Sequence, residues 1–97
     1  MNVEVACTAR ARLLGLHGRD ALDGVLMLVP CNDIQTFAMR HAIDVAFAAA
    51  DGTVLEAHRN VPPNRRLRNK RAVATFERLA SEEAWFCPGD RFQITNR

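Results

Sequence analysis

The fold of this chain is decided by the stretch TFAMRHAIDVAFAAADGTVLEAH, residues 36–58. Before its turn, apolar side chains alternate at Ile43, Val45 and Phe47, and a period of two favours a β-strand. Asp51-Gly52 then separates this segment from a second extended segment. Glycine readily adopts the positive φ of tight hairpin turns, so Asp-Gly between two such runs indicates a hairpin. The stretch therefore predicts a β-hairpin that turns at Asp51-Gly52.

Further strands are expected on both sides of this hairpin. Residues 2–6 alternate polar and apolar side chains, and residues 25–29 form a continuous apolar run; both patterns favour strands. Residues 34–39 continue the extended pattern ahead of the hairpin. Residues 91–95 alternate again, and we expect them to close the sheet.

Helix is expected in two short segments only. Residues 9–16 are rich in alanine, arginine and leucine, which are good helix formers, and Thr8 precedes them as an N-cap. Residues 81–84 resemble a capped helical turn with Ser81 as its cap. The segment 72–79 mixes residues that favour a strand with residues that favour a helix, so both assignments remain open there.

A basic segment follows the hairpin. Six cations and no acid lie between residues 59 and 71, although the net charge of the whole chain is only +2. The cations are Arg59, Arg65, Arg66, Arg68, Lys70 and Arg71. Prolines at 62 and 63 exclude a helix interior or a central strand over residues 61–64, and 65–71 is expected to be a loop or an exposed edge. The segment could contact nucleic-acid phosphates, but it lacks interleaved aromatic residues, so a nucleic-acid partner is the less favoured interpretation.

The composition limits the remaining possibilities. With 97 residues, 48% of them hydrophobic and 25% charged, the chain is expected to be one globular domain over 1–97. Cys7, Cys31 and Cys87 show no metal-binding or redox spacing, so they are expected to be buried thiols. No metal, cofactor or membrane partner is expected. The absence of a signal-peptide pattern and of an apolar run of roughly 20 residues predicts a cytoplasmic protein.

Taken together, the motifs resemble those of a known family. They are Val3-Glu4-Val5-Ala6, Gly15-Leu16-His17-Gly18-Arg19, Gly24-Val25-Leu26-Met27-Leu28, Thr36-Phe37-Ala38-Met39-Arg40, Ile43-Asp44-Val45-Ala46-Phe47, Asp51-Gly52-Thr53-Val54, Pro62-Pro63, Phe76-Glu77 and Gly89-Asp90. In this combination they are similar to the bacterial and archaeal family called domain of unknown function 192. The resemblance implies a mainly β fold, a small β-sandwich or partly open barrel with one short N-terminal helix. It implies no established activity.

Arg40 and Asp44 are the first candidate for a site. On an extended backbone, residues four apart point the same way, and an arginine can bind a carboxylate through two parallel hydrogen bonds. Arg40 could thus hold an anionic ligand that Asp44 orients. Alternatively, the two residues form an ion pair that only stabilises the connection between strands.

The other predicted ligand-binding residues are Arg19, Met39 and His41. Arg19 follows two glycines whose backbone N–H groups could approach an anion, although a helix C-cap also explains them. Met39 and His41 lie inside the family-type motif. The sequence carries no nucleophile elbow, P-loop or paired-carboxylate motif, and no catalytic residue is assigned.

Three functions follow from these observations. The first is a non-enzymatic ligand-binding or accessory module with a polar site at Arg40 and Asp44, whose partner is a small anionic ligand or a protein. The second is an enzyme of undetected class that acts on a small anionic substrate through a titratable group such as His41 or Asp44, in a pocket beside Arg40. The third is nucleic-acid contact through the basic loop 59–71.

Overall fold

The computed structural model describes residues 3–7, 24–37 and 39–92, and within them it contains strands and irregular segments but no helix. The strands are β1 (Val3–Ala6), β2 (Val25–Leu28), β3 (Asp33–Gln35), β4 (Ile43–Ala48), β5 (Val54–Val61), β6 (Arg66–Arg68) and β7 (Ala74–Leu79). Five of them form one sheet in the order β1-β2-β7-β4-β5, and β3 pairs with β6 in a separate two-stranded ribbon. The mainly β prediction is confirmed, and within these residues the sheets do not close into a barrel.

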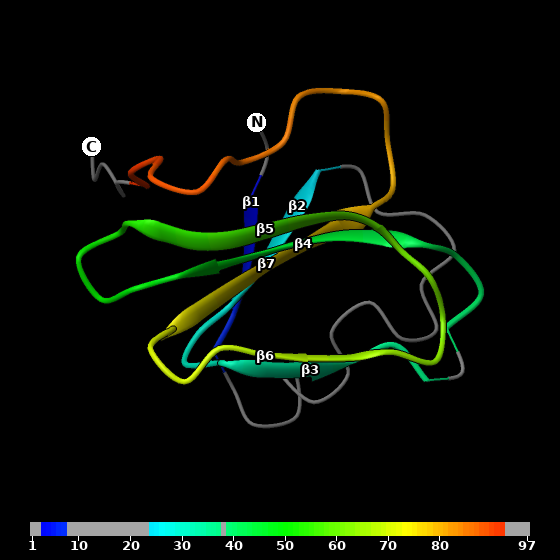
Figure 1. Ribbon diagram of the computed structural model, residues 1–97, viewed down its shortest axis with the longest axis horizontal. Coiled ribbons are helices and arrows are strands. Elements are labelled where there is room, and N and C mark those ends of the chain that lie inside the picture. Colours follow the sequence, from blue (N-terminus) through cyan, green and yellow to red (C-terminus); the bar gives the residue numbers. More distant parts are fainter. Residues whose placement is uncertain (1–2, 8–23, 38, 93–97) are drawn as a thin grey trace.

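The large sheet lies between two other layers (Figure 1). Its first face packs against the β3–β6 ribbon through a core that includes Leu28, Val45 and Ile34. The second face carries another core, which includes Phe76 and Trp85, and the segment 80–92 covers it. Because β4 lies between these two cores, all six of its residues are buried, so the alternation of Ile43, Val45 and Phe47 marks only one of its two buried faces.

The strand β7 settles the ambiguous segment 72–79. It pairs in antiparallel fashion with both β2 and β4, and its residues Ala74 to Arg78 are buried. Glu77, Arg78 and Leu79 favour helices in isolation, but pairing on both edges overrides that preference. The central strand of the sheet is therefore a segment whose own sequence does not predict a strand.

The other strand predictions are confirmed in part. Of the predicted extended segment 34–39, the described residues beyond Gln35 are not in a strand, because β3 ends there. β1 and β2 occupy the predicted segments, and β4 and β5 form the hairpin that turns at Asp51-Gly52. Of the basic residues 65–71, predicted to be a loop or an exposed edge, Arg66–Arg68 form the short strand β6 and the rest are irregular. Of the predicted closing strand 91–95, Arg91 forms an isolated bridge with Thr53 and 93–95 lies outside the described residues. The predicted helix 9–16 also lies outside them.

The predicted helical turn at 81–84 is wrong. This segment is irregular, because the carbonyls of Ser81, Glu83 and Ala84 accept hydrogen bonds from arginine side chains of the sheet. Those bonds tie the segment to the sheet and leave its carbonyls no role in an internal helical ladder. The Ser81 hydroxyl still accepts a bond from the backbone N–H of Glu83, at 3.0 Å.

Burial of the cysteines also differs from the prediction. Cys7 and Cys87 are exposed and Cys31 is half-buried, and all three are free thiols. Cys87 is exposed because it begins the predicted turn 87–90, where the Asp90 carboxylate accepts its backbone N–H at 2.8 Å. Among the described residues, no helix has the length and apolar character required to cross a membrane.

The hairpin turn places Gly52 directly against the backbone of Phe92. Gly52 adopts a φ of +90°, and a Cβ at this position would overlap the Phe92 carbonyl oxygen. The Phe92 N–H also donates to the Gly52 carbonyl, at 2.6 Å. The turn residue is therefore glycine for two reasons, its backbone conformation and the lack of space.

Replacing Gly52 tests this contact. We expect Gly52→Ala to lower the free energy of unfolding by about 3 kcal/mol or more, because strain from the positive φ, about 1–2 kcal/mol, adds to the overlap with Phe92. Gly89→Ala is the matched control, since Gly89 has a φ of +94° and open space around it; it should lose only the conformational part. Urea denaturation of both variants measures the difference, and equal losses would contradict the steric argument.

Candidate functional site

A buried ion pair joins the two central strands. Asp44 on β4 and Arg78 on β7 are direct cross-strand partners, and their exposed fractions are 0% and 7%. Arg78 Nε donates to Asp44 Oδ2 at 2.8 Å. The backbone N–H of Asn60, on β5, donates to Asp44 Oδ1 at 2.9 Å. Both carboxylate oxygens therefore accept hydrogen bonds from neighbouring strands, as a buried carboxylate requires.

Arg78 also holds residues 80–92, which we call the covering segment, on the sheet. Arg78 donates to the carbonyls of Glu83 and Ala84 at 2.7 and 2.9 Å, and its guanidinium lies 4.5 Å from the Trp85 ring centroid. Arg59 adds bonds to the carbonyls of Ser81 and Glu83, both 2.7 Å. Two arginines thus anchor the segment 80–92 through its main chain.

The predicted pairing of Arg40 with Asp44 needs correction, because the ion pair that Asp44 forms is with Arg78. The prediction assumed an extended backbone from 40 to 44, whereas residues 40 and 41 form a bend and β4 begins at Ile43. Arg40 is exposed and Asp44 is fully buried. Asp44 therefore belongs to the core of the fold, where it joins strands through Arg78 and not through the expected Arg40.

The remaining predicted site residues lie in different surroundings. Met39 is 9% exposed and packs in the core next to the ribbon. His41 is exposed and lines a shallow hollow of about 350 Å³ together with Ala42, Leu79 and Ala80. Arg19 lies outside the described residues. Anion binding by Arg40 and His41 stays a prediction.

One polar cluster was missed by the sequence analysis. On β5, Glu56 Oε2 lies 2.9 Å from His58 Nε2, and Asn69 donates to Glu56 Oε1 at 2.6 Å. The hydrogen bond with His58 is the main reason that the pKa of Glu56 is lowered from its ordinary value. The two-residue spacing of Glu56 and His58 on a strand could have revealed their shared face, but nothing local points to Asn69.

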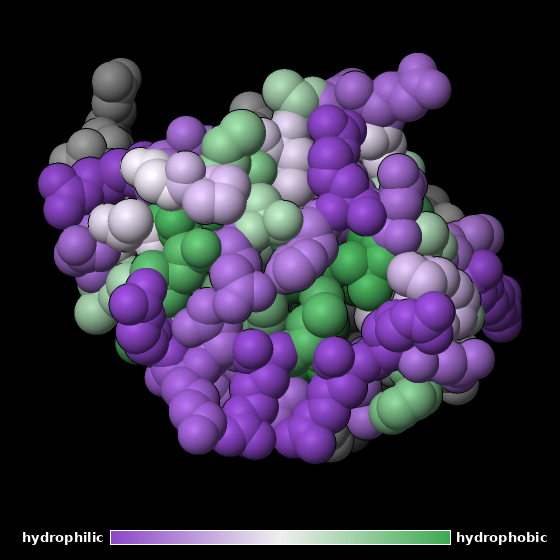
Figure 2. Space-filling view, in the orientation of Figure 1, coloured by the Kyte–Doolittle hydropathy of each residue, from purple (hydrophilic) through white to green (hydrophobic). Residues whose placement is uncertain are grey.

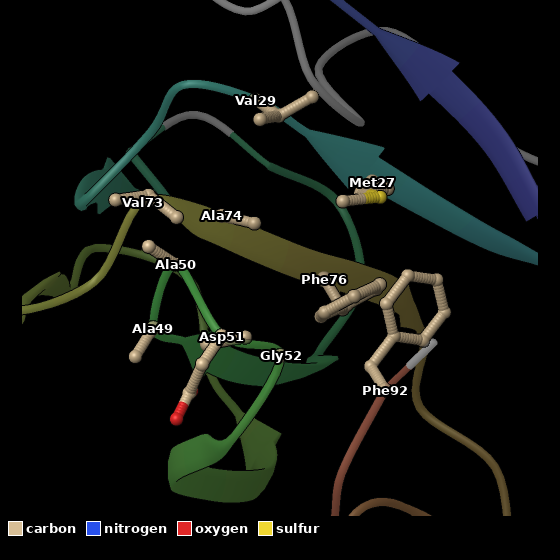
Figure 3. Close-up of a pocket in the computed structure, with 11 residues that line it drawn as sticks. Met27, Val29, Ala49, Ala50, Asp51, Gly52, Val73, Ala74, Phe76 and Phe92 are labelled. Carbon is tan, nitrogen blue, oxygen red and sulfur yellow. The ribbon is translucent and has the colours of Figure 1, made fainter. Parts of the chain in front are cut away.

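A recess of apolar character lies beside the hairpin turn. Its volume is about 330 Å³, and it opens on the sheet face that carries Phe76. Figure 3 shows Met27, Val29 and Val73 on one side, the turn residues 49–52 on the other, and the ring of Phe92 beside Phe76. We call this recess the hairpin pocket.

Asp51 is the charged residue among those that line the hairpin pocket. Its carboxylate accepts the backbone N–H of Thr53 at 2.9 Å and lies 3.4 Å from Arg91. The bond from Thr53 is the main cause that lowers the pKa of Asp51. In Figure 3 the Asp51 oxygen points away from the apolar residues opposite. The hairpin pocket thus offers apolar contact and shape.

In the described part of the chain, no group of three or more His, Cys, Asp or Glu side chains is placed to hold a metal ion.

Comparison with known proteins supports the architecture. The sequence profile of the DUF192 family, described as "Uncharacterized ACR", matches residues 1–93. No curated protein matches the sequence. A protein of unknown function from Novosphingobium aromaticivorans has a similar crystal structure, with a TM-score of 0.77, 21% identity, and coverage of 92% of this chain and 71% of that one. A "putative transcription regulator" from Sinorhizobium meliloti gives a TM-score of 0.74 at 22% identity, covering 92% and 78%. At these identities the likeness concerns the fold alone.

The buried pair can be tested through stability. We expect Asp44→Ala to destabilise the protein by about 3–5 kcal/mol, because it leaves the Arg78 guanidinium buried without its carboxylate. The double variant Asp44→Ala with Arg78→Met should recover part of this loss. Arg91→Gln, which breaks the exposed pair with Asp51, is the control and should cost less than about 1 kcal/mol. Urea denaturation distinguishes them, and a loss for Asp44→Ala no larger than the control's would contradict the structural role.

The Glu56 cluster makes a prediction about acid. A carboxyl with a lowered pKa in the folded state stabilises the fold above its unfolded pKa, and this contribution disappears as the pH falls through the folded pKa. We therefore expect Glu56→Gln to flatten the loss of stability below about pH 5, by less than about 1 kcal/mol because the site is partly exposed. Glu82→Gln, an exposed glutamate outside the cluster, is the control. Thermal melts between neutral and acidic pH should show the flattening in Glu56→Gln and not in the control.

Proposed function

The chain belongs to the domain of unknown function 192 family, and we propose that it is a non-enzymatic binding module that holds a small apolar ligand in the hairpin pocket. The observation that carries this proposal is the pocket itself. It has a volume of about 330 Å³ and is lined mainly by apolar side chains. Ligand pockets span about 300–1,000 Å³ and are lined predominantly by hydrophobic side chains, so the hairpin pocket suits a small ligand.

The partners of the buried and pocket-lining charged residues favour a binding function over a catalytic one. Asp44 and Arg78, the most deeply buried ion pair within residues 24–37 and 39–92, join the strands and bind the covering segment. Asp51, at the hairpin pocket, is engaged by Thr53 and Arg91. An enzyme acting on an anionic substrate would instead need a titratable group and a cation directed into a shared recess.

The chemistry of the pocket also defines the ligand class. Burial of apolar surface contributes roughly 25 cal/mol per Å², whereas a buried charge without a partner is costly. A neutral aromatic or aliphatic group therefore fits the pocket better than the anion that the sequence suggested. The ring pair of Phe76 and Phe92, whose centroids are 4.8 Å apart, would contact such a group edge-on or face-on.

A neutral fluorescent probe tests the proposal. We expect N-phenyl-1-naphthylamine to bind the protein saturably at one site, with increased fluorescence. Ala50→Leu should weaken this binding by about tenfold or more, since Ala50 lines the mouth of the hairpin pocket (Figure 3) and the larger side chain fills a recess of this size.

Ala84→Leu is the matched control. Ala84 is also an exposed alanine, but it lies on the covering segment and does not line the pocket, so this variant should bind the probe like the wild type. Absence of saturable binding, or equal binding by Ala50→Leu and the wild type, would overturn the assignment of the pocket.

A further inference from the structure

The β3–β6 ribbon turns the basic segment into a charged face. In β6, Leu67 is half-buried and packs against the core, whereas Arg66 and Arg68 on either side of it are exposed. Side chains alternate along a strand, so the two arginines share the outer face of the ribbon. The centre of the basic segment is thus a strand that presents Arg66 and Arg68 together.

Few acids balance these cations. Arg65, Lys70 and Arg71 flank β6 and are exposed as well. The acid of the two ribbon strands is Asp33, which forms a two-point ion pair with Arg66. Strongly hydrophilic residues accordingly dominate the lower edge of the molecule in Figure 2, where the ribbon lies in Figure 1.

The fold also supplies an aromatic side chain that the basic segment lacks in sequence. Thr36 is buried and its N–H donates to the Arg65 carbonyl at 2.7 Å, while Asn64 N–H donates to the Thr36 carbonyl at 3.0 Å. These bonds place Phe37 close to Arg65, although 28 positions separate the two residues in the sequence. The Phe37 side chain is 47% exposed.

We propose that the outer face of the β3–β6 ribbon, together with Phe37, binds single-stranded nucleic acid. Arg66 and Arg68 contact backbone phosphates, whose negative charge supplies a salt-dependent affinity. Phe37 stacks on an unpaired base, a contact that tolerates any base because every base has a π-face. This face lies on the other side of the large sheet from the hairpin pocket, so the proposal does not depend on that site.

Fluorescence anisotropy with a labelled oligo(dT) of about 15 nucleotides tests the proposal. We expect binding by the wild type that weakens as salt increases. Reversing both charges, Arg66→Glu with Arg68→Glu, should reduce affinity by about tenfold or more and lower the salt slope by about 1.4, since each phosphate contact on a single strand contributes about 0.7. Phe37→Ala should reduce affinity by about fivefold or more.

Two further variants make the test specific. Asp33→Asn removes the acid that engages Arg66 and should tighten binding by about threefold, a gain that loss of folding could not produce. Arg91→Glu changes an exposed arginine on the opposite layer and should leave affinity nearly unchanged. Circular dichroism and urea midpoints confirm that each variant is folded.

Three outcomes would overturn the proposal. One is the absence of salt-dependent binding by the wild type. The second is an affinity for oligo(dT) that Phe37→Ala leaves unchanged, which would reduce the face to a general polyanion surface. The third is equal competition by heparin, a polyanion without bases, and by unlabelled oligo(dT) of matched charge.

Discussion

The structure depends on one buried interaction, the ion pair between Asp44 and Arg78. The pair joins the two central strands, β4 and β7. Asp44 also accepts a hydrogen bond from the backbone N–H of Asn60 on β5, and Arg78 donates to a carbonyl of the covering segment. A buried pair of this kind is costly to desolvate and is stable only when its remaining hydrogen-bonding groups are satisfied. Here carbonyls and a tryptophan ring satisfy them, so strands and covering segment stabilise one another.

This arrangement gives the two faces of the sheet different chemistry. On one face, a segment without regular structure leaves an apolar recess near the hairpin turn. On the other, a short ribbon buries Ile34 and Leu67 and exposes arginines. Because the ribbon and the covering segment are attached to opposite faces, their surfaces can serve separate partners. The family resemblance defines the shared scaffold, and these surfaces are where an individual activity would reside.

Sequence reasoning succeeded where the signal is local. Asp51-Gly52 specifies a turn by backbone chemistry, and the hairpin follows. It failed where partners come from distant strands: Arg78 lies 34 positions from Asp44, whereas Arg40 has only a suggestive spacing. The segment 72–79 was ambiguous for the same reason, since pairing on both edges, and not its own composition, makes it a strand.

The first part of the covering segment, residues 81–84, is held by its backbone, whereas Trp85 and Phe86 after it pack through their side chains. Arg59 and Arg78 bind the carbonyls of residues 81, 83 and 84, and the side chains of 82–84 are exposed. Any residue supplies a carbonyl, so substitutions there leave the attachment intact, and related chains can diverge in this region without altering its path. Selection would act instead on the arginines that bind it and on Trp85, whose indole N–H donates to the Val45 carbonyl at 3.1 Å.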